Sequence, residues 1–353
     1  MKLAILTFQF AHNYGALLQA YALKEFLKSQ GHTVEIANYY PDTFKDTYSI
    51  NPFAKGVPLR GRVKRVLQYP LRAPQAEAFE AFKQNLLCLN EESGEQSAIC
   101  DKLNKYDAVI FGSDQIWNTR LTKNDTLYWG EGICTKKIAY AASLGTSALN
   151  AEQENACCRL LPEYSHISLR EFGLEMQVGK LANKEIKVVM DPVFLLDESK
   201  WVKLIRQPRM QSNYMLFYFL FEDKRLLQAG LEYAEKRGLE AIEIHPTLAA
   251  RHKGCRLVSQ IGPQEFLGLI GNADAVCTNS FHAMAFSTIF GKNVIHIPNP
   301  SSPKRTTTLL ERVGMSLHIG NELPLYCMSD IDKTILNGQI NSSKDFLLNS
   351  LRA

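Results

Sequence analysis

Residues 1–38 read MKLAILTFQF AHNYGALLQA YALKEFLKSQ GHTVEIAN, and this stretch decides the fold. An apolar strand is predicted over residues 3–8, followed by a helix over residues 15–30 whose apolar side chains recur on one face. Gly31 stands where helices commonly end in a left-handed residue, and a second strand is predicted over residues 32–38. A strand, a helix and a second strand in this order indicate a parallel βαβ unit.

The same alternation continues in two blocks. The first block has further strands at residues 107–111, 137–141 and 167–169, and the second has strands at 186–190, 215–220, 240–244, 274–277 and 293–297, with helices at 223–236, 263–272 and 281–290. We therefore predict an α/β protein with two Rossmann-like domains facing a cleft. The first would span 1–183, interrupted by a basic helical insert at 45–100, and the second 184–353, ending in a C-terminal tail. Ligands of such sheets bind beyond the carboxyl ends of the strands.

Composition excludes several classes of protein. The 353 residues are 46% hydrophobic and 22% charged, as in ordinary globular proteins rather than disordered or fibrous ones. No apolar run approaches the roughly 20 residues of a membrane span, and the first six residues are too short and polar-bounded for a signal peptide. We therefore expect a cytoplasmic protein. The net charge of +4 suits an anionic small ligand, but it is too weak to indicate nucleic acid. The eight cysteines lack zinc spacing, so no metal site is predicted.

The insert is basic, and it contains no acid from residue 47 to residue 75. Its cations are Lys55, Arg60, Arg62, Lys64, Arg65 and Arg72. Two interpretations are open. The insert is either a solvated helix face or a surface that docks on the inner membrane or on a phosphate-bearing, lipid-linked acceptor.

Two segments of the first domain could carry chemistry. Asn13 can cap the helix after the first strand, and Gly15 lets the backbone approach a ligand there. The segment Phe111-Gly112-Ser113-Asp114-Gln115-Ile116-Trp117-Asn118 follows a buried strand. Asp114 could accept a proton or orient a sugar hydroxyl. Trp117 could stack on a sugar ring or be buried in the core.

Three further segments contribute cations and a histidine. Arg170 directly follows a strand, where it could bind a carboxylate or phosphate, or form a surface pair with Glu171. Ser280 and His282 begin a helix after a buried strand, and histidine suits proton transfer near neutral pH, although a single histidine is usually structural. Lys304 and Arg305 precede another helix, where an anion would be favoured.

Together these segments resemble the polysaccharide pyruvyl transferase family. The resemblance rests on Asn13-Tyr14-Gly15-Ala16 with Leu18-Gln19-Ala20-Tyr21-Ala22-Leu23, on Gly112-Ser113-Asp114-Gln115-Ile116-Trp117-Asn118, on Tyr140-Ala141-Ala142-Ser143-Leu144-Gly145, on Ser168-Leu169-Arg170-Glu171, on Asp191-Pro192-Val193, on Ser280-Phe281-His282 and on Arg305. Each motif is weak, but the ordered set runs through nearly the whole chain. The resemblance implies a fold similar to the GT-B glycosyltransferases.

The resemblance also implies a reaction. Phosphoenolpyruvate gives its pyruvyl group to two hydroxyls of a sugar in a polysaccharide precursor, so that a cyclic ketal forms and phosphate leaves, without a cofactor. By similarity, His282 would be the general acid. The donor would be bound by Arg170, Arg305, Ser280 and Lys304. The acceptor would be bound by Asn13, Gly15 and Trp117, with Asp114 as a second catalytic group. Some family members carry Arg where this chain has Ser280, so other cations must hold the donor here.

Two other functions compete with this one. A GT-B glycosyltransferase would bind a nucleotide sugar through a base- and ribose-binding loop in the second domain. A non-catalytic binding subunit would keep the fold without depending on His282.

Overall fold

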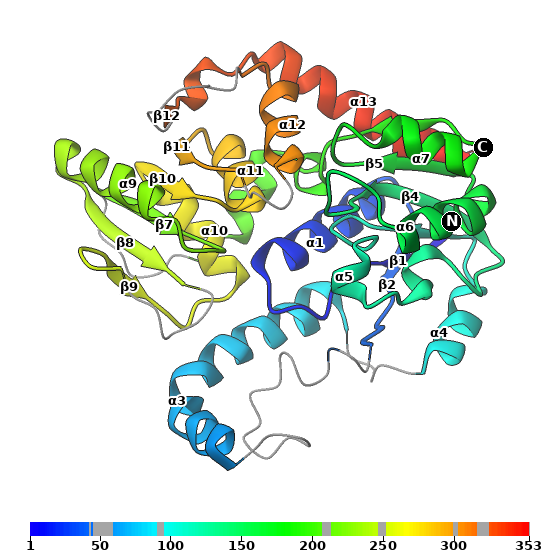
Figure 1. The fold of residues 1–353 in the computed structure, drawn as a ribbon, viewed down its shortest axis with the longest axis horizontal. Coiled ribbons are helices and arrows are strands. Elements are labelled where there is room, and N and C mark those ends of the chain that lie inside the picture. The colour runs from blue at the N-terminus through cyan, green and yellow to red at the C-terminus, as the bar shows by residue number, and fades with distance from the viewer. Residues whose placement is uncertain are drawn as a thin grey trace.

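The computed structural model describes residues 1–41, 44, 59–89, 95–206, 213–245, 252–298, 303–315 and 325–352. Within the helix Leu59–Phe82 it describes no side chain for residues 59–65, 67, 68 and 71. Figure 1 shows two α/β domains side by side, with the first strands and helices on the right and the later ones on the left.

The first domain is built on a parallel sheet of strand order β2-β1-β3-β4-β5-β6. Its strands are β1 Lys2–Leu6, β2 Thr33–Ile36, β3 Ala108–Phe111, β4 Lys136–Ala142, β5 His166–Leu169 and β6 Ile186–Val188. Its helices include α1 Tyr14–Ser29, α4 Gln96–Leu103, α5 Thr119–Thr122, α6 Ala151–Arg159 and α7 Glu175–Ala182. The predicted βαβ unit is confirmed: Gly31 has a φ of +83° directly after α1, and β2 pairs in parallel with β1.

The second domain is built on a sheet of order β12-β11-β10-β7-β8-β9, in which only β12 is antiparallel to its neighbour. Its strands are β7 Tyr214–Tyr218, β8 Glu240–Ile244, β9 Arg256–Val258, β10 Ala275–Thr278, β11 Asn293–His296 and β12 Leu325–Tyr326. Its helices are α8 Glu198–Leu204, α9 Lys224–Arg237, α10 Pro263–Asn272, α11 Phe281–Ile289, α12 Lys304–Arg312 and α13 Lys333–Arg352.

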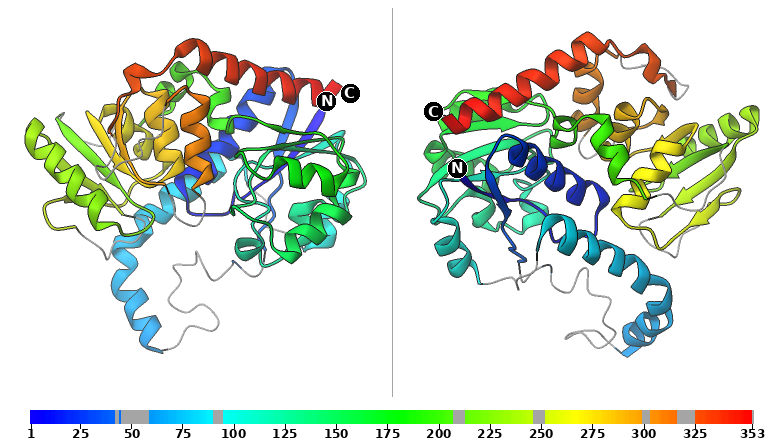
Figure 2. Two further views of the ribbon diagram at one scale, coloured as in Figure 1. Left: turned by 45° about the horizontal axis from the view of Figure 1, so that its top comes forward. Right: turned by 180° about the vertical axis from the view of Figure 1, so that it is seen from behind.

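The two domains do not divide at residue 183. Strand β6 pairs with β5 in the first sheet, so the predicted boundary cuts through that sheet. The chain then returns, because α13 runs from the second domain back over the first, bringing both termini together (Figures 1 and 2). The Ser343 hydroxyl accepts the Met190 backbone N–H at 2.9 Å, and the Phe346 ring lies 6.5 Å from the ring of Tyr140. The segment expected to be a tail of the second domain therefore packs on the first.

One hydrophobic core joins the domains. It contains apolar residues of α1, of the turn after β6, and of α10 and α11. At its centre the ring of Tyr14 stacks on Phe266 with centroids 4.5 Å apart, and the Tyr14 hydroxyl donates to the Ile261 carbonyl at 3.3 Å. Gln75 of the helix Leu59–Phe82 donates to the same hydroxyl at 3.0 Å. These contacts fix the carboxyl ends of the two sheets relative to each other.

The insert contains the long helix α3 Leu59–Phe82, which is followed by the π-helical turn Lys83–Leu87. The end of α3 nearer Leu59 projects away from both domains (Figures 1 and 2). Lys55 and the side chains of Arg60, Arg62, Lys64 and Arg65 lie outside the described residues, so docking on a membrane or a phosphate stays a prediction. Within the described part of the chain, no helix is both long enough and apolar enough to cross a membrane.

Candidate active site

A cavity of about 210 Å³ lies where the carboxyl ends of the two sheets meet. The first domain lines it with residues that follow β1 and β3 and with residues of α1 and α5. The second domain lines it with residues that follow β7 and with the beginnings of α11 and α12. The lining residues are Phe8, Phe10, Ala11, Asn13, Ala16, Phe44, Asp114, Gln115, Leu121, Leu220, Ser280, Phe281, His282 and Arg305. A ligand here contacts both domains, as the predicted cleft requires.

His282 is the only histidine among these lining residues. It lies in the first turn of α11, whose N-cap Ser280 accepts the Ala283 N–H. The imidazole is largely buried, and its Nε2 has no hydrogen-bond partner. Nε2 lies 3.6 Å from Asp191 Oδ2, an ion-pair distance when the ring is protonated.

Gly15 explains how the imidazole fits against α1. A Cβ at position 15 would lie 2.0 Å from His282 Nδ1 and 2.2 Å from Cγ, far closer than any van der Waals contact allows. The glycine is therefore required by the close approach of the ring. Gly15 was expected to contact the acceptor; in the structure its neighbours Asn13 and Ala16 line the cavity, and Gly15 itself supports the histidine.

Asp191 is the residue that sequence reasoning left without a role. It follows β6, its side chain is fully buried, and its Oδ2 accepts from Arg170 Nη1 at 2.8 Å and from the Ser113 hydroxyl at 3.3 Å. Burial alone would raise the pKa of Asp191, but His282 and Arg170 outweigh burial and hold the pKa below the usual carboxyl value. Asp191 is therefore a carboxylate at neutral pH, and it places a fixed negative charge beside the imidazole. The motif Asp191-Pro192-Val193 was the feature of the sequence that could have indicated a role for Asp191.

Arg170 is enclosed by carboxylates. Besides Asp191, Asp114 lies 3.7 Å from its Nη2 and Glu171 lies 3.7 Å from its Nε, and the residue is only 2% exposed. Burial lowers its pKa, but the three acids outweigh burial and raise it, so the guanidinium is always charged. Arg170 is not among the residues that line the cavity. The structure thus places this predicted donor ligand behind the cavity wall, where it neutralises buried acids. Arg170 and Glu171 are both buried, so their contact is not the surface pair considered above.

Replacing Arg170 with glutamine is expected to destabilise the protein by about 3–5 kcal/mol, because it leaves buried carboxylates without a counter-charge. Urea unfolding measures this loss. Arg159→Gln is the matched control: it breaks the exposed pair of Arg159 and Glu131 and should cost less than about 1 kcal/mol. Equal stability of the two variants would contradict this role of Arg170.

Arg305 presents a less compensated cation. It begins the first turn of α12 and lines the cavity, and its guanidinium and that of Arg170 both lie over the Phe281 ring, 5.4 and 4.6 Å from the centroid. Its Nε is buried without a hydrogen bond. Burial first, and then the charge of Arg170, lower the pKa of Arg305 to about 10, so it stays protonated at neutral pH. An anionic ligand would supply the missing partner.

Three other predicted residues line the cavity. Asn13 caps α1, accepting the Ala16 N–H at 3.2 Å, and is otherwise exposed. Asp114 has a positive φ of +69° and accepts the Gln115 N–H at 2.9 Å. Ser280 caps α11. These polar groups come from both domains and can contact hydroxyls or anionic oxygens in the cavity.

Besides Gly15 and Arg170, two further predicted residues do not line the cavity. Trp117 is fully buried: its ring stacks on Trp129 with centroids 5.1 Å apart, and its indole N–H donates to the Tyr128 carbonyl at 3.0 Å. Of the two alternatives for Trp117, the structure confirms burial in the core, and this packing keeps the indole from stacking on a sugar. Lys304 is exposed at the start of α12 and is not part of the lining.

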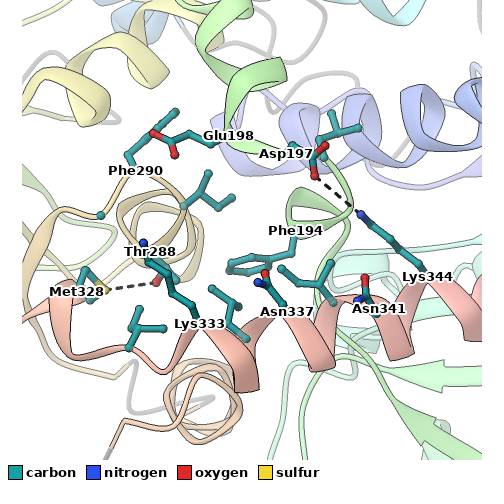
Figure 3. A pocket seen from close by; sticks show the side chains of 16 residues that line it. Phe194, Asp197, Glu198, Thr288, Phe290, Met328, Lys333, Asn337, Asn341 and Lys344 are labelled. Carbon is teal, nitrogen blue, oxygen red and sulfur yellow. Dashed lines mark hydrogen bonds and ion pairs between the residues drawn. The ribbon is translucent and has the colours of Figure 1, made fainter.

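A larger cavity, of about 500 Å³, lies at the other end of α11, between α8 and α13 (Figure 3). Thr288 and Phe290 face it from α11, and Lys344 of α13 lies 4.0 Å from Asp197. It is lined by apolar groups, carboxamides, lysines and two acids, and no histidine or arginine contributes. The chemistry expected from the sequence therefore belongs to the smaller cavity. Among the described residues, no cluster of three or more His, Cys, Asp or Glu side chains could hold a metal.

Solved structures resemble this one at low sequence identity, and the one below with a TM-score above 0.5 shares its fold. The S. aureus MnaA–UDP co-structure is 9% identical, with 98% of this chain and 87% of that chain covered and a TM-score of 0.52. UDP-GlcNAc 2-epimerase from Neisseria meningitidis bound to UDP-GlcNAc is 12% identical, with coverages of 99% and 100% and a TM-score of 0.47. E. coli ADP-heptose heptosyltransferase II is 14% identical, with 99% of each chain covered and a TM-score of 0.40. The fold is of the predicted GT-B type.

No curated protein sequence gives a match. The family profile of the polysaccharide pyruvyl transferases does match, over residues 13–302. The matched residues include α1 and His282. Of the segments that line the cavity, α12 and the part of the loop after β1 that precedes residue 13 lie outside the match. The chain is therefore a transferase that belongs to the polysaccharide pyruvyl transferase family.

Proposed function

We propose that this transferase moves the pyruvyl group of phosphoenolpyruvate onto two hydroxyls of an acceptor sugar, forming a cyclic ketal and releasing phosphate. The observation that carries the proposal is the pairing of His282 with Arg305 in one cavity, with Asp191 buried behind the imidazole. A proton donor and an anion-binding group are the two things that this reaction needs most.

The cavity suits the donor in charge. Arg305 and His282 come from neighbouring helices and line the same space of about 210 Å³. Arg305 can hold the carboxylate or the phosphate of the donor through a bidentate contact. The N-terminus of α11, at Ser280, offers a second place for anionic oxygens.

The proton inventory of the reaction balances without a cofactor. His282 donates a proton to the CH₂ carbon of the enol, which becomes the methyl group, and the neighbouring carbon becomes oxocarbenium-like. One sugar hydroxyl adds to that carbon and gives up its proton, which returns the imidazole to its charged form. The carbon–oxygen bond to phosphate then breaks, the second hydroxyl adds, and its proton leaves with the phosphate.

The pocket geometry assigns separate tasks within these steps. Asp191 lies 3.6 Å from Nε2, so Nδ1, on the side of Gly15, is the nitrogen that would deliver the proton. Asp114 would orient an acceptor hydroxyl for attack, and Asn13 would position that sugar.

Arg305→Gln is expected to raise the KM for phosphoenolpyruvate by about 10- to 100-fold, because a hydrogen-bonded charged partner contributes about 1.5–3 kcal/mol. Steady-state phosphate release measures this effect. Lys304→Gln, which removes an exposed cation from the neighbouring position, is the matched control and should leave the KM near the wild-type value. Equal effects of the two substitutions would argue against Arg305 as the donor clamp.

The function itself is tested with purified protein, phosphoenolpyruvate and methyl glycosides of galactose, mannose and N-acetylhexosamines. We expect acceptor-dependent phosphate release and a ketal-bearing product by mass spectrometry. No release with any acceptor, together with a thermal shift by UDP- or GDP-sugars but not by phosphoenolpyruvate, would favour the glycosyltransferase alternative.

A further inference from the structure

Two exposed leucines stand at the edge of the active-site cavity. Among the described residues, eight large hydrophobic side chains are exposed, and two of these, Leu121 at 41% and Leu220 at 43%, line this one cavity. Isolated exposed leucines are common on protein surfaces. A pair on the rim of a cavity whose floor carries His282 and Arg305 needs an explanation.

The two leucines come from different domains and both are held in place. Leu121 lies in α5, and its backbone N–H donates to the Asn118 carbonyl at 2.9 Å. Leu220 follows β7, and its N–H donates to Asn279 Oδ1 at 2.7 Å. Asn279 immediately precedes the cap Ser280, so the position of Leu220 is tied to the turn that presents His282.

Aromatic rings of the first domain line the same cavity as the two leucines. Phe10 and Phe44 line the same cavity with ring centroids 5.1 Å apart, and Phe8 lies 5.7 Å from Phe10. Phe8 and Phe10 are buried in the wall, and Phe44 is partly exposed. The polar lining groups Asn13, Asp114 and Arg305 therefore share the cavity with a continuous apolar wall.

We propose that the rim formed by Leu121 and Leu220, together with the wall of Phe8, Phe10 and Phe44, is a subsite for an apolar group attached to the acceptor sugar. The inference rests on the proposed function, because the sugar hydroxyls must face His282 and Asp114. A sugar that carries only hydroxyls gains nothing from leucine contacts, whereas an alkyl or acyl group is removed from water by them. Two sources share this chemistry: an aglycone at the anomeric carbon, and an acyl substituent on the ring.

The experiment compares three acceptors built on the sugar that supports phosphate release: its methyl glycoside, its octyl glycoside and an N-acylated methyl glycoside. We expect kcat/KM to rise by about tenfold from the methyl to the octyl glycoside or to the N-acylated sugar. This is the gain from burying between one and two methylene groups, at about fourfold each. The arm that gains identifies the source.

Leu121→Ser and Leu220→Ser should each remove most of that gain, measured within each variant as the ratio of kcat/KM for the apolar acceptor to kcat/KM for the methyl glycoside. Met176→Ser, at an 86% exposed position on α7, is the matched control and should keep the gain. Equal kcat/KM for all three acceptors, or a gain that survives both leucine substitutions, would overturn the proposal.

A binding measurement separates this inference from the reaction. Saturation-transfer NMR on the wild-type protein should show the octyl methylene protons, or the acyl protons, in contact with protein, and the double variant Leu121→Ser/Leu220→Ser should lose that signal. If no glycoside supports phosphate release but this contact is seen and is lost in the double variant, the proposed reaction fails and the subsite stands. If neither octyl nor acyl protons receive saturation, the subsite is contradicted.

Discussion

His282→Gln is expected to lower kcat for phosphate release by about 100- to 10,000-fold, the usual contribution of a positioned general acid. Glutamine is of similar size and stays uncharged at every pH, so it can fill the site but cannot protonate the enol carbon. Because Arg305 rather than His282 would hold the anionic groups of the donor, the KM for phosphoenolpyruvate should change less than kcat. Steady-state kinetics of phosphate release separates the two constants.

The control for this prediction is another buried histidine. His296 lies in β11 and its Nδ1 is 2.9 Å from the Thr278 carbonyl, away from the cavity lining. Burial lowers the pKa of His296 to about 4, so it is neutral at physiological pH. His296→Gln should leave kcat within about threefold of wild type in the folded fraction. Activity that survives in His282→Gln would favour a non-catalytic role for this turn.

Gly15→Ala is expected to reduce kcat by about 100-fold although it adds a single methyl group. The new Cβ would lie 2.0 Å from His282 Nδ1, so the ring must move, and a displacement of about 1 Å from the reacting position costs about that factor. Circular dichroism and kcat, measured on the same preparation, distinguish misplacement of the ring from failure to fold.

Two comparisons make the Gly15 prediction specific. Gly338→Ala adds the same methyl group to α13 where no atom lies within 4 Å, and it should leave kcat unchanged. The double variant Gly15→Ala/His282→Gln should be no slower than His282→Gln alone, because both changes act through one imidazole. Additive losses would show that Gly15 affects the reaction by another route.

Local sequence patterns predicted the parallel sheets well, because most interior strands are short apolar runs that are followed by a helix; β8, which is followed by β9, is an exception. They failed where pairing depends on long-range contacts. Strand β6 has few buried residues and lies next to the second block in sequence, yet it completes the first sheet. Nor could periodicity alone show that α13 crosses back to pack on β4, since that choice is made by Ser343 and Phe346 meeting the first domain.

The sequence patterns predicted which strand and helix ends line the candidate site, but not which side chains contact one another there. His282, Arg305, Asn13, Ser280 and Asp114 all reach the cavity because each follows a strand or begins a helix at the carboxyl edges of the sheets. Burial keeps two other predicted residues, Trp117 and Arg170, from lining the cavity. The residues next to Trp117 and Arg170 in the sequence do not indicate that these side chains are buried. Trp117 stacks on Trp129, and Arg170 pairs with Asp114 and Asp191, all of which lie in other segments of the chain.

A structure with phosphoenolpyruvate bound to the intact protein tests the account most directly. We predict that the anionic groups of the donor contact Arg305 and that its CH₂ carbon lies within about 3–4 Å of the His282 ring. Phosphoenolpyruvate bound in the larger cavity between α8 and α13, or bound beside Arg305 with the enol carbon turned away from His282, would contradict the proposed chemistry.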